Sequence, residues 1–103
     1  MIMAWIAGGQ GDAMFHLHSK RHIKGMNELL TNIAQNSEIK RKVSESFRIL
    51  ISTPENQADR AISSFAALLH IHSDRVLPRH KAIETAEDIW SHHEQYRKNL
   101  ERK

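Results

Sequence analysis

The chain has 103 residues, of which 40% are apolar and 26% are charged, and it contains no cysteine. A chain of this length can bury one hydrophobic core, so we expect a single domain. The lack of cysteine excludes disulfide bonds, thiolate metal sites and catalytic thiols, and it fits a reducing, cytoplasmic setting. The formal charge of +3 allows contact with anionic lipid or nucleic acid but requires neither.

Residues 1–13 are predicted to form a short non-helical strip ahead of the helices. The strip contains the apolar stretch Ala4-Trp5-Ile6-Ala7, which runs into Gly8 and Gly9. It lacks the basic start and the length of a signal peptide, so we do not expect export. The Trp5 side chain either covers the helices or stays exposed as an anchor for a partner.

Four helices are predicted from apolar residues that recur at helical spacing, over residues 15–35, 38–52, 54–73 and 79–101. Because short connections place successive helices side by side, the sequence predicts an all-α fold, an antiparallel up-down four-helix bundle. Within the first of these helices, Gly25 is expected to lower stability by about 1 kcal/mol relative to alanine.

Capping residues and two prolines set the predicted helix boundaries. Ser37 is the expected N-cap of the second helix and Thr53 that of the third. Pro54 fits the first position of the third helix, because a proline there loses no helical hydrogen bond. Pro78 precedes the fourth helix, so we expect a tight connection before it in which the apolar pair Val76-Leu77 packs under the helices.

The eight histidines raise the question of a metal site. His18 and His22 are four residues apart on the first predicted helix and could share a zinc ion. Such a site needs a third ligand, and Ser19 stands where the metalloprotease motif has its glutamate, so we expect no metal and no cofactor. We expect His72 and His93 to lie partly in the bundle seam, where their protonation would destabilise the domain at acid pH.

The sequence lacks the motifs by which the common enzyme classes are identified. It has no nucleophile elbow, no glycine loop for phosphate and no Glu-x-x-His pair, so we expect neither catalysis nor a small-molecule substrate. The basic C-terminal end either complements the helix dipole or forms an electrostatic patch with Trp90 and Tyr96 as aromatic anchors. Its cations are Arg97, Lys98, Arg102 and Lys103.

In its layout the chain resembles the immunity proteins that protect lactic-acid bacteria from their own pediocin-like bacteriocins. Three stretches carry the resemblance: the strip Trp5-Ile6-Ala7-Gly8-Gly9 ahead of four helices, Glu38-Ile39-Lys40-Arg41-Lys42-Val43, and Arg75-Val76-Leu77-Pro78 through Trp90. It covers nearly the whole chain. The high number of histidines, eight in 103 residues, is a departure from the family.

The resemblance implies a non-catalytic, cytoplasmic protein that protects the producer cell. Immunity proteins of this family recognise the membrane components of the mannose phosphotransferase permease when bacteriocin is bound to them, and their C-terminal half carries much of the choice of bacteriocin. Contact with an anionic membrane face is a further expectation, because positive charge favours it. Carried over to this chain, the expected partner-binding residues are Arg75, Arg79, Lys81, His92, Tyr96, Arg97 and Lys98, with Trp5 as a weaker candidate.

Two other functions remain open. A small helical nucleic-acid-binding or regulatory protein is the main alternative, because the third and fourth helices faintly resemble a helix-turn-helix. Pro78 lies in that turn, however, and Glu84, Glu87 and Asp88 would repel phosphate, so we expect no nucleic-acid partner. A histidine metal-binding protein is the second alternative, and it predicts stoichiometric zinc and a Tm that a chelator lowers.

Overall fold

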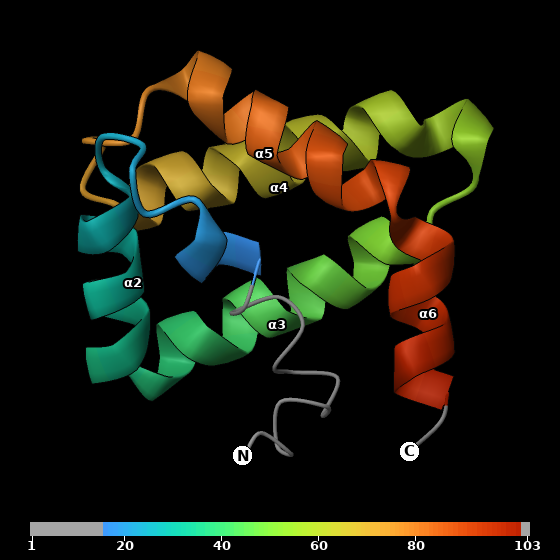
Figure 1. The fold of residues 1–103 in the computed structure, drawn as a ribbon, viewed down its shortest axis with the longest axis horizontal. Coiled ribbons are helices and arrows are strands. Elements are labelled where there is room, and N and C mark those ends of the chain that lie inside the picture. The colour runs from blue at the N-terminus through green and yellow to red at the C-terminus, as the bar shows by residue number, and fades with distance from the viewer. Residues whose placement is uncertain (1–15, 102–103) are drawn as a thin grey trace.

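A computed structural model describes residues 16–101, and within that range the regular structure is entirely helical (Figure 1). After a helical turn at 16–19 come α2 (Met26–Gln35), α3 (Ser37–Ile51), the 3₁₀ turn η2 (Glu55–Gln57), α4 (Ala58–His72), α5 (Arg79–Ser91) and α6 (His93–Glu101). α4 and α5 lie side by side, α3 packs against α4, and α2 and α6 stand near the two ends of α3. The predicted all-α class is confirmed, with more and shorter helices than the sequence pattern indicated.

The core lies between α3, α4 and α5, and α2 and the 16–19 turn close it. In α3, Val43, Phe47 and Leu50 recur at the spacing of one helical face and are buried together. Burying each large apolar side chain stabilises the fold by about 1.5–3 kcal/mol. The largest fully buried side chains include Phe47, Phe65, Leu17, Met26, Leu29, Leu50, Ile51, Leu69, Leu77 and Ile89.

The predicted helix over 15–35 is interrupted in its middle. Its first helical turn ends at residue 19, turns follow, and α2 starts only at Met26. Gly25 has a φ of 90°, in the left-handed region, and a Cβ added to it would lie 2.2 Å from the backbone nitrogen of Leu77. Gly25 is therefore not a weak point of a helix, because it lets the turn at residues 20–25 pack against the α4–α5 connection.

Two predicted N-caps are wrong. α3 is capped by Asn36 rather than Ser37, and the Asn36 side-chain oxygen accepts two backbone N–H groups of the first turn at 2.9 and 3.2 Å. Thr53 does not cap the third helix, because its hydroxyl donates to the carbonyl four residues earlier at 2.7 Å. Pro54 instead leads into η2, and α4 starts at Ala58.

The predicted helix over 79–101 is divided at His92 into α5 and α6. The Ser91 hydroxyl and the His92 Nδ1–H both donate to the Asp88 carbonyl, at 2.7 and 2.9 Å. In a continuous helix that carbonyl would accept the His92 backbone N–H, which donates to the Ile89 carbonyl at 3.0 Å instead. Competition from polar side chains for one backbone acceptor thus accompanies the end of α5, and α6 runs in a new direction (Figure 1).

The connection between α4 and α5 is tight, as predicted. Ser73 is fully buried, donates from its hydroxyl to the His70 carbonyl at 2.8 Å and accepts the Leu77 N–H at 3.0 Å. Leu77 is fully buried and Val76 half-buried, which confirms that this pair packs under the helices. Among the described residues, no helix has the length and apolar character needed to cross a bilayer.

Candidate functional site

Polar side chains from three parts of the chain meet where the 16–19 turn contacts the α5–α6 junction. Leu17 is fully buried and anchors the 16–19 turn in the core. The break after Ser91 directs α6 so that the side chain of Tyr96 faces this turn. We call this group the junction cluster. Its members are His16, Lys20, Asp88, His92 and Tyr96.

His16 is the central side chain of the junction cluster and is only 11% exposed. Its Nδ1 shares a hydrogen bond of 2.9 Å with the Tyr96 hydroxyl, and the two rings meet edge to face. Its Nε2 lies 3.2 Å from Asp88 Oδ2 but out of line for a hydrogen bond, so this nitrogen is buried without one. The ring is thus enclosed between α5, α6 and its own turn.

Asp88 is the negative centre of the junction cluster. Lys20 Nζ lies 3.1 Å from its Oδ2, and His92 Nδ1 lies 3.7 Å from its Oδ1. Burial opposes the charge of the carboxylate, but the hydrogen bond and charge of Lys20, with smaller contributions from His16 and His92, lower the pKa of Asp88. Asp88 is therefore ionised at neutral pH.

The same surroundings favour the neutral form of His16. Burial is the largest influence and lowers the pKa of His16; the Asp88 carboxylate attracts the charged ring, whereas Lys20 and His92 repel it. The pKa consequently falls below its ordinary value of 6.5. Because a carboxylate only accepts, a proton on Nε2 is the favoured neutral form, and Nδ1 then accepts from the Tyr96 hydroxyl. The His16 ring of the junction cluster can take up a proton, but its Nε2 atom is buried and therefore not accessible to a substrate.

The aromatic side chains predicted as anchors are both packed against the core. Tyr96 is half-buried and meets Phe47 of α3 edge to face, with 5.2 Å between ring centroids. Trp90 is also half-buried, donates from Nε1 to the Thr53 carbonyl at 3.3 Å and stacks on His93 at 4.7 Å. These contacts fix α6 and the end of α5 on the rest of the molecule.

The predicted partner-binding residues fall into two groups at opposite ends of α5. Arg75 and Arg79 are exposed at its start, where Lys81 pairs with Glu84 at 3.3 Å. The exposed cations of α6 and the junction cluster lie at the far end of α5, which is a helix about 20 Å long. The second group comprises His92, Tyr96, Arg97 and Lys98, and Trp5 lies outside the described residues.

The histidines are arranged differently from what the sequence predicts. The helical turn that holds His18 ends before His22, so the two do not share one helical face, and no three metal-binding side chains gather among residues 16–101. His72 and His93 are half-buried, but His93 Nδ1–H donates to the Trp90 carbonyl within its own stretch of chain at 2.7 Å. Sequence reasoning missed two bonds from imidazole rings to other segments: His70 Nδ1–H donates to the Leu77 carbonyl at 2.7 Å, and His16 bonds to Tyr96 of α6. No spacing rule links His16 to a tyrosine 80 residues later.

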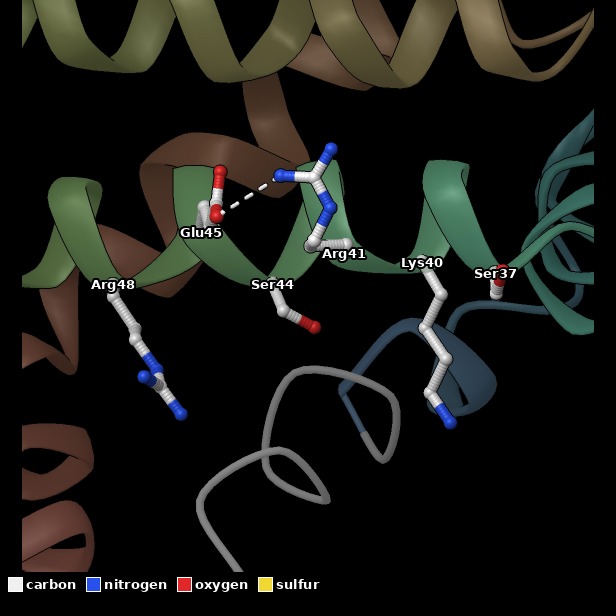
Figure 2. A pocket seen from close by; sticks show the side chains of 6 residues that line it. All are labelled: Ser37, Lys40, Arg41, Ser44, Glu45 and Arg48. Carbon is white, nitrogen blue, oxygen red and sulfur yellow. Dashed lines mark hydrogen bonds and ion pairs between the residues drawn. The ribbon is translucent and has the colours of Figure 1, made fainter.

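Two surface hollows lie away from the junction cluster, and the sequence did not indicate either. A hollow of about 490 Å³ follows α3, where Lys40, Ser44 and Arg48 point to one side while Arg41 pairs with Glu45 at 3.2 Å (Figure 2). A groove of about 320 Å³ between α3 and α4 is bordered by Ile49, which is 66% exposed.

Comparison with known proteins adds nothing to the geometry of the site. No protein-family model, no curated protein and no solved structure matches this chain.

Proposed function

We propose that the chain is a non-catalytic binding protein of the bacteriocin-immunity type. In this proposal it acts in the cytoplasm of a bacterium that makes a pediocin-like bacteriocin, and it recognises mannose phosphotransferase membrane components that hold the bacteriocin. One observation carries the proposal: Arg97 and Lys98 are exposed on α6 directly after Tyr96, which Phe47 holds in place. Exposed cations beside a fixed aromatic suit recognition of a protein partner.

The helix arrangement supports the same proposal. We take α2, α3, α4 and the α5–α6 pair as the four antiparallel segments of an up-down bundle, modified by the breaks at Gly25 and His92. Connections of a few residues between these segments favour neighbouring, oppositely directed helices. The break at His92 matters for the proposed function because it sets the direction in which α6 presents its cations.

A protection assay tests this proposal. The protein is expressed in a pediocin-sensitive host, and a panel of pediocin-like bacteriocins is titrated against the cells. We expect resistance to one or a few of them. Uniform sensitivity, with the protein shown to be folded and abundant, would overturn the proposal.

Charge reversal then tests the α6 surface. Arg97→Glu with Lys98→Glu should abolish protection while helicity and Tm stay unchanged. Lys40→Glu with Lys42→Glu reverses two exposed charges on the first half of α3 and serves as the matched control, which should keep protection. Full protection by the folded Arg97/Lys98 variant would place the partner surface elsewhere.

Nucleic-acid binding remains a second candidate because the positive charge is unevenly distributed. Residues 1–48 contain seven Lys and Arg against four Asp and Glu, whereas residues 49–103 contain eight against eight. Phosphate would therefore contact α3 and the turn at residues 20–25 rather than the helix-turn-helix-like α4 and α5. A gel shift on duplex DNA that weakens with salt, and that Lys40→Glu with Arg48→Glu removes, would favour this candidate.

A further inference from the structure

The groove between α3 and α4 has an apolar floor that opens to solvent. Leu50 of α3 and Phe65 of α4 are almost fully buried, yet both line the groove and form its floor. Ile49 borders the groove with a side chain that is 66% exposed, although isoleucine is among the residue types most often buried. An apolar floor with an apolar side chain beside it is the lining by which ligand pockets hold an apolar body.

A single cation stands at the rim of this groove. Among the described residues that line the groove, Arg60 is the only charged one, and it is exposed. Within residues 16–101 its guanidinium has neither an ion pair nor a hydrogen bond, and the same holds for the hydroxyls of Ser46 and Ser64 and the amide of Gln57. The groove therefore combines an apolar floor with an unpaired positive charge and available polar groups.

We propose that this groove binds a small carboxylic acid with an apolar chain, which lies on the floor while the carboxylate meets Arg60. A guanidinium presents parallel N–H donors that match the two oxygens of a carboxylate. A phosphate group carries more charge and is recognised by clusters of arginines, whereas the described lining offers one cation. The site is separate from the partner surface on α6, and the proposal does not rest on the proposed function.

The volume of the groove limits the length of the chain that it can hold. The groove has a volume of about 320 Å³. At about 30 Å³ for each non-hydrogen atom, the share of one water molecule in the liquid, it has room for about ten such atoms. A carboxylate of about eight carbons has this size. A ligand this small in an open groove binds weakly, so we expect a Kd on the order of 1 mM.

Titration with octanoate, followed by the shifts of backbone amides in NMR spectra, tests the proposal. We expect saturable shifts confined to the parts of α3 and α4 that line the groove. Butyrate has the same carboxylate but a shorter chain, and it should bind at least about tenfold more weakly, because each buried methylene adds to the affinity. Octylammonium has an apolar chain of the same length and the opposite charge. Binding of octylammonium as tight as that of octanoate would overturn the proposal.

Two variants at exposed positions test the role of the charge without disturbing the core. Arg60→Gln should weaken octanoate binding about tenfold, because it removes a charge-assisted hydrogen bond. Ser64→Glu places a carboxylate one turn from Arg60, where the two side chains can pair, and should remove octanoate binding altogether. Arg48→Gln removes an exposed arginine of α3 that lies outside the groove and should leave binding unchanged.

The proposal is overturned if the wild type shows no saturable shifts at the groove, or if Arg60→Gln binds octanoate as tightly as the wild type. Octanoate shifts spread evenly over the whole surface would also overturn it, because they would indicate adsorption without a site.

Discussion

Replacing Gly25 with alanine tests the interruption of the first predicted helix, because the sequence and the structure predict effects of opposite sign. In a continuous helix over 15–35, Gly25→Ala stabilises the protein by about 1 kcal/mol. In the structure the residue has a φ of 90°, where an L-residue costs about 1–2 kcal/mol. The new Cβ would also lie 2.2, 2.4 and 2.5 Å from backbone atoms of Leu77 and Val76.

Those neighbours are main-chain atoms and cannot rotate away, so the turn at residues 20–25 must move off the α4–α5 connection. Overpacking of this kind costs about 1–3 kcal/mol, which brings the expected loss to about 2–5 kcal/mol. That is a large part of the roughly 5–15 kcal/mol by which domains are stable. Denaturant unfolding followed by circular dichroism measures it directly.

The control for Gly25→Ala is Asn27→Ala, at an exposed position in the first turn of α2, which should change stability by only a few tenths of a kcal/mol. Stabilisation by Gly25→Ala would refute the positive φ and support the continuous helix. A loss of stability within error of the control would show that the turn can move away from Leu77 without cost.

Three further changes test the local bonds. Asn36→Ala should lower the free energy of unfolding, measured with denaturant, by about 1 kcal/mol, whereas Ser37→Ala should leave it unchanged. A loss in Ser37→Ala but not in Asn36→Ala would mean that Ser37 is the N-cap, as the sequence predicts. Ser73→Ala should lower the free energy of unfolding by about 1–3 kcal/mol, because it leaves the buried Leu77 N–H without its acceptor; no loss would contradict that bond. The double variant Ser91→Ala with His92→Leu should raise the helical circular dichroism signal, because it restores backbone bonding at the α5–α6 junction. An unchanged signal would mean that packing of α6 causes the break.

The all-α class could be predicted because helical periodicity is a local property of the sequence. The stripe Val43, Phe47 and Leu50 shows it. The packing of the half-buried Val76 and the buried Leu77 before Pro78 could also be predicted, from their apolar character in a short connection. The interruptions could not be predicted in the same way. Glycine inside a periodic stretch is compatible with a weak helix or a turn, and only the distant Leu77 decides between them at Gly25.

The candidate site was predicted less well, for two physical reasons. A helix assumed to run unbroken over 79–101 places Arg79 and Arg97 on one element, whereas side-chain competition at His92 divides that element. The junction cluster depends on His16 reaching Asp88 and Tyr96, and no local spacing encodes such a contact. His72 and His93 were expected to lie partly in the bundle seam, and both are half-buried, but His93 Nδ1–H donates within its own stretch of chain.

The separation of 80 positions between His16 and Tyr96 bears on the order in which the chain acquires its structure. At about 5–20 residues per second, a ribosome takes about 4–16 seconds to add that length of chain. α2, α3 and α4 can pack during this interval, but residues 16–25 have no complete docking surface until α6 has left the exit tunnel. A nascent chain stopped at the end of α5 should therefore leave this early segment open to a protease while the later helices are already protected.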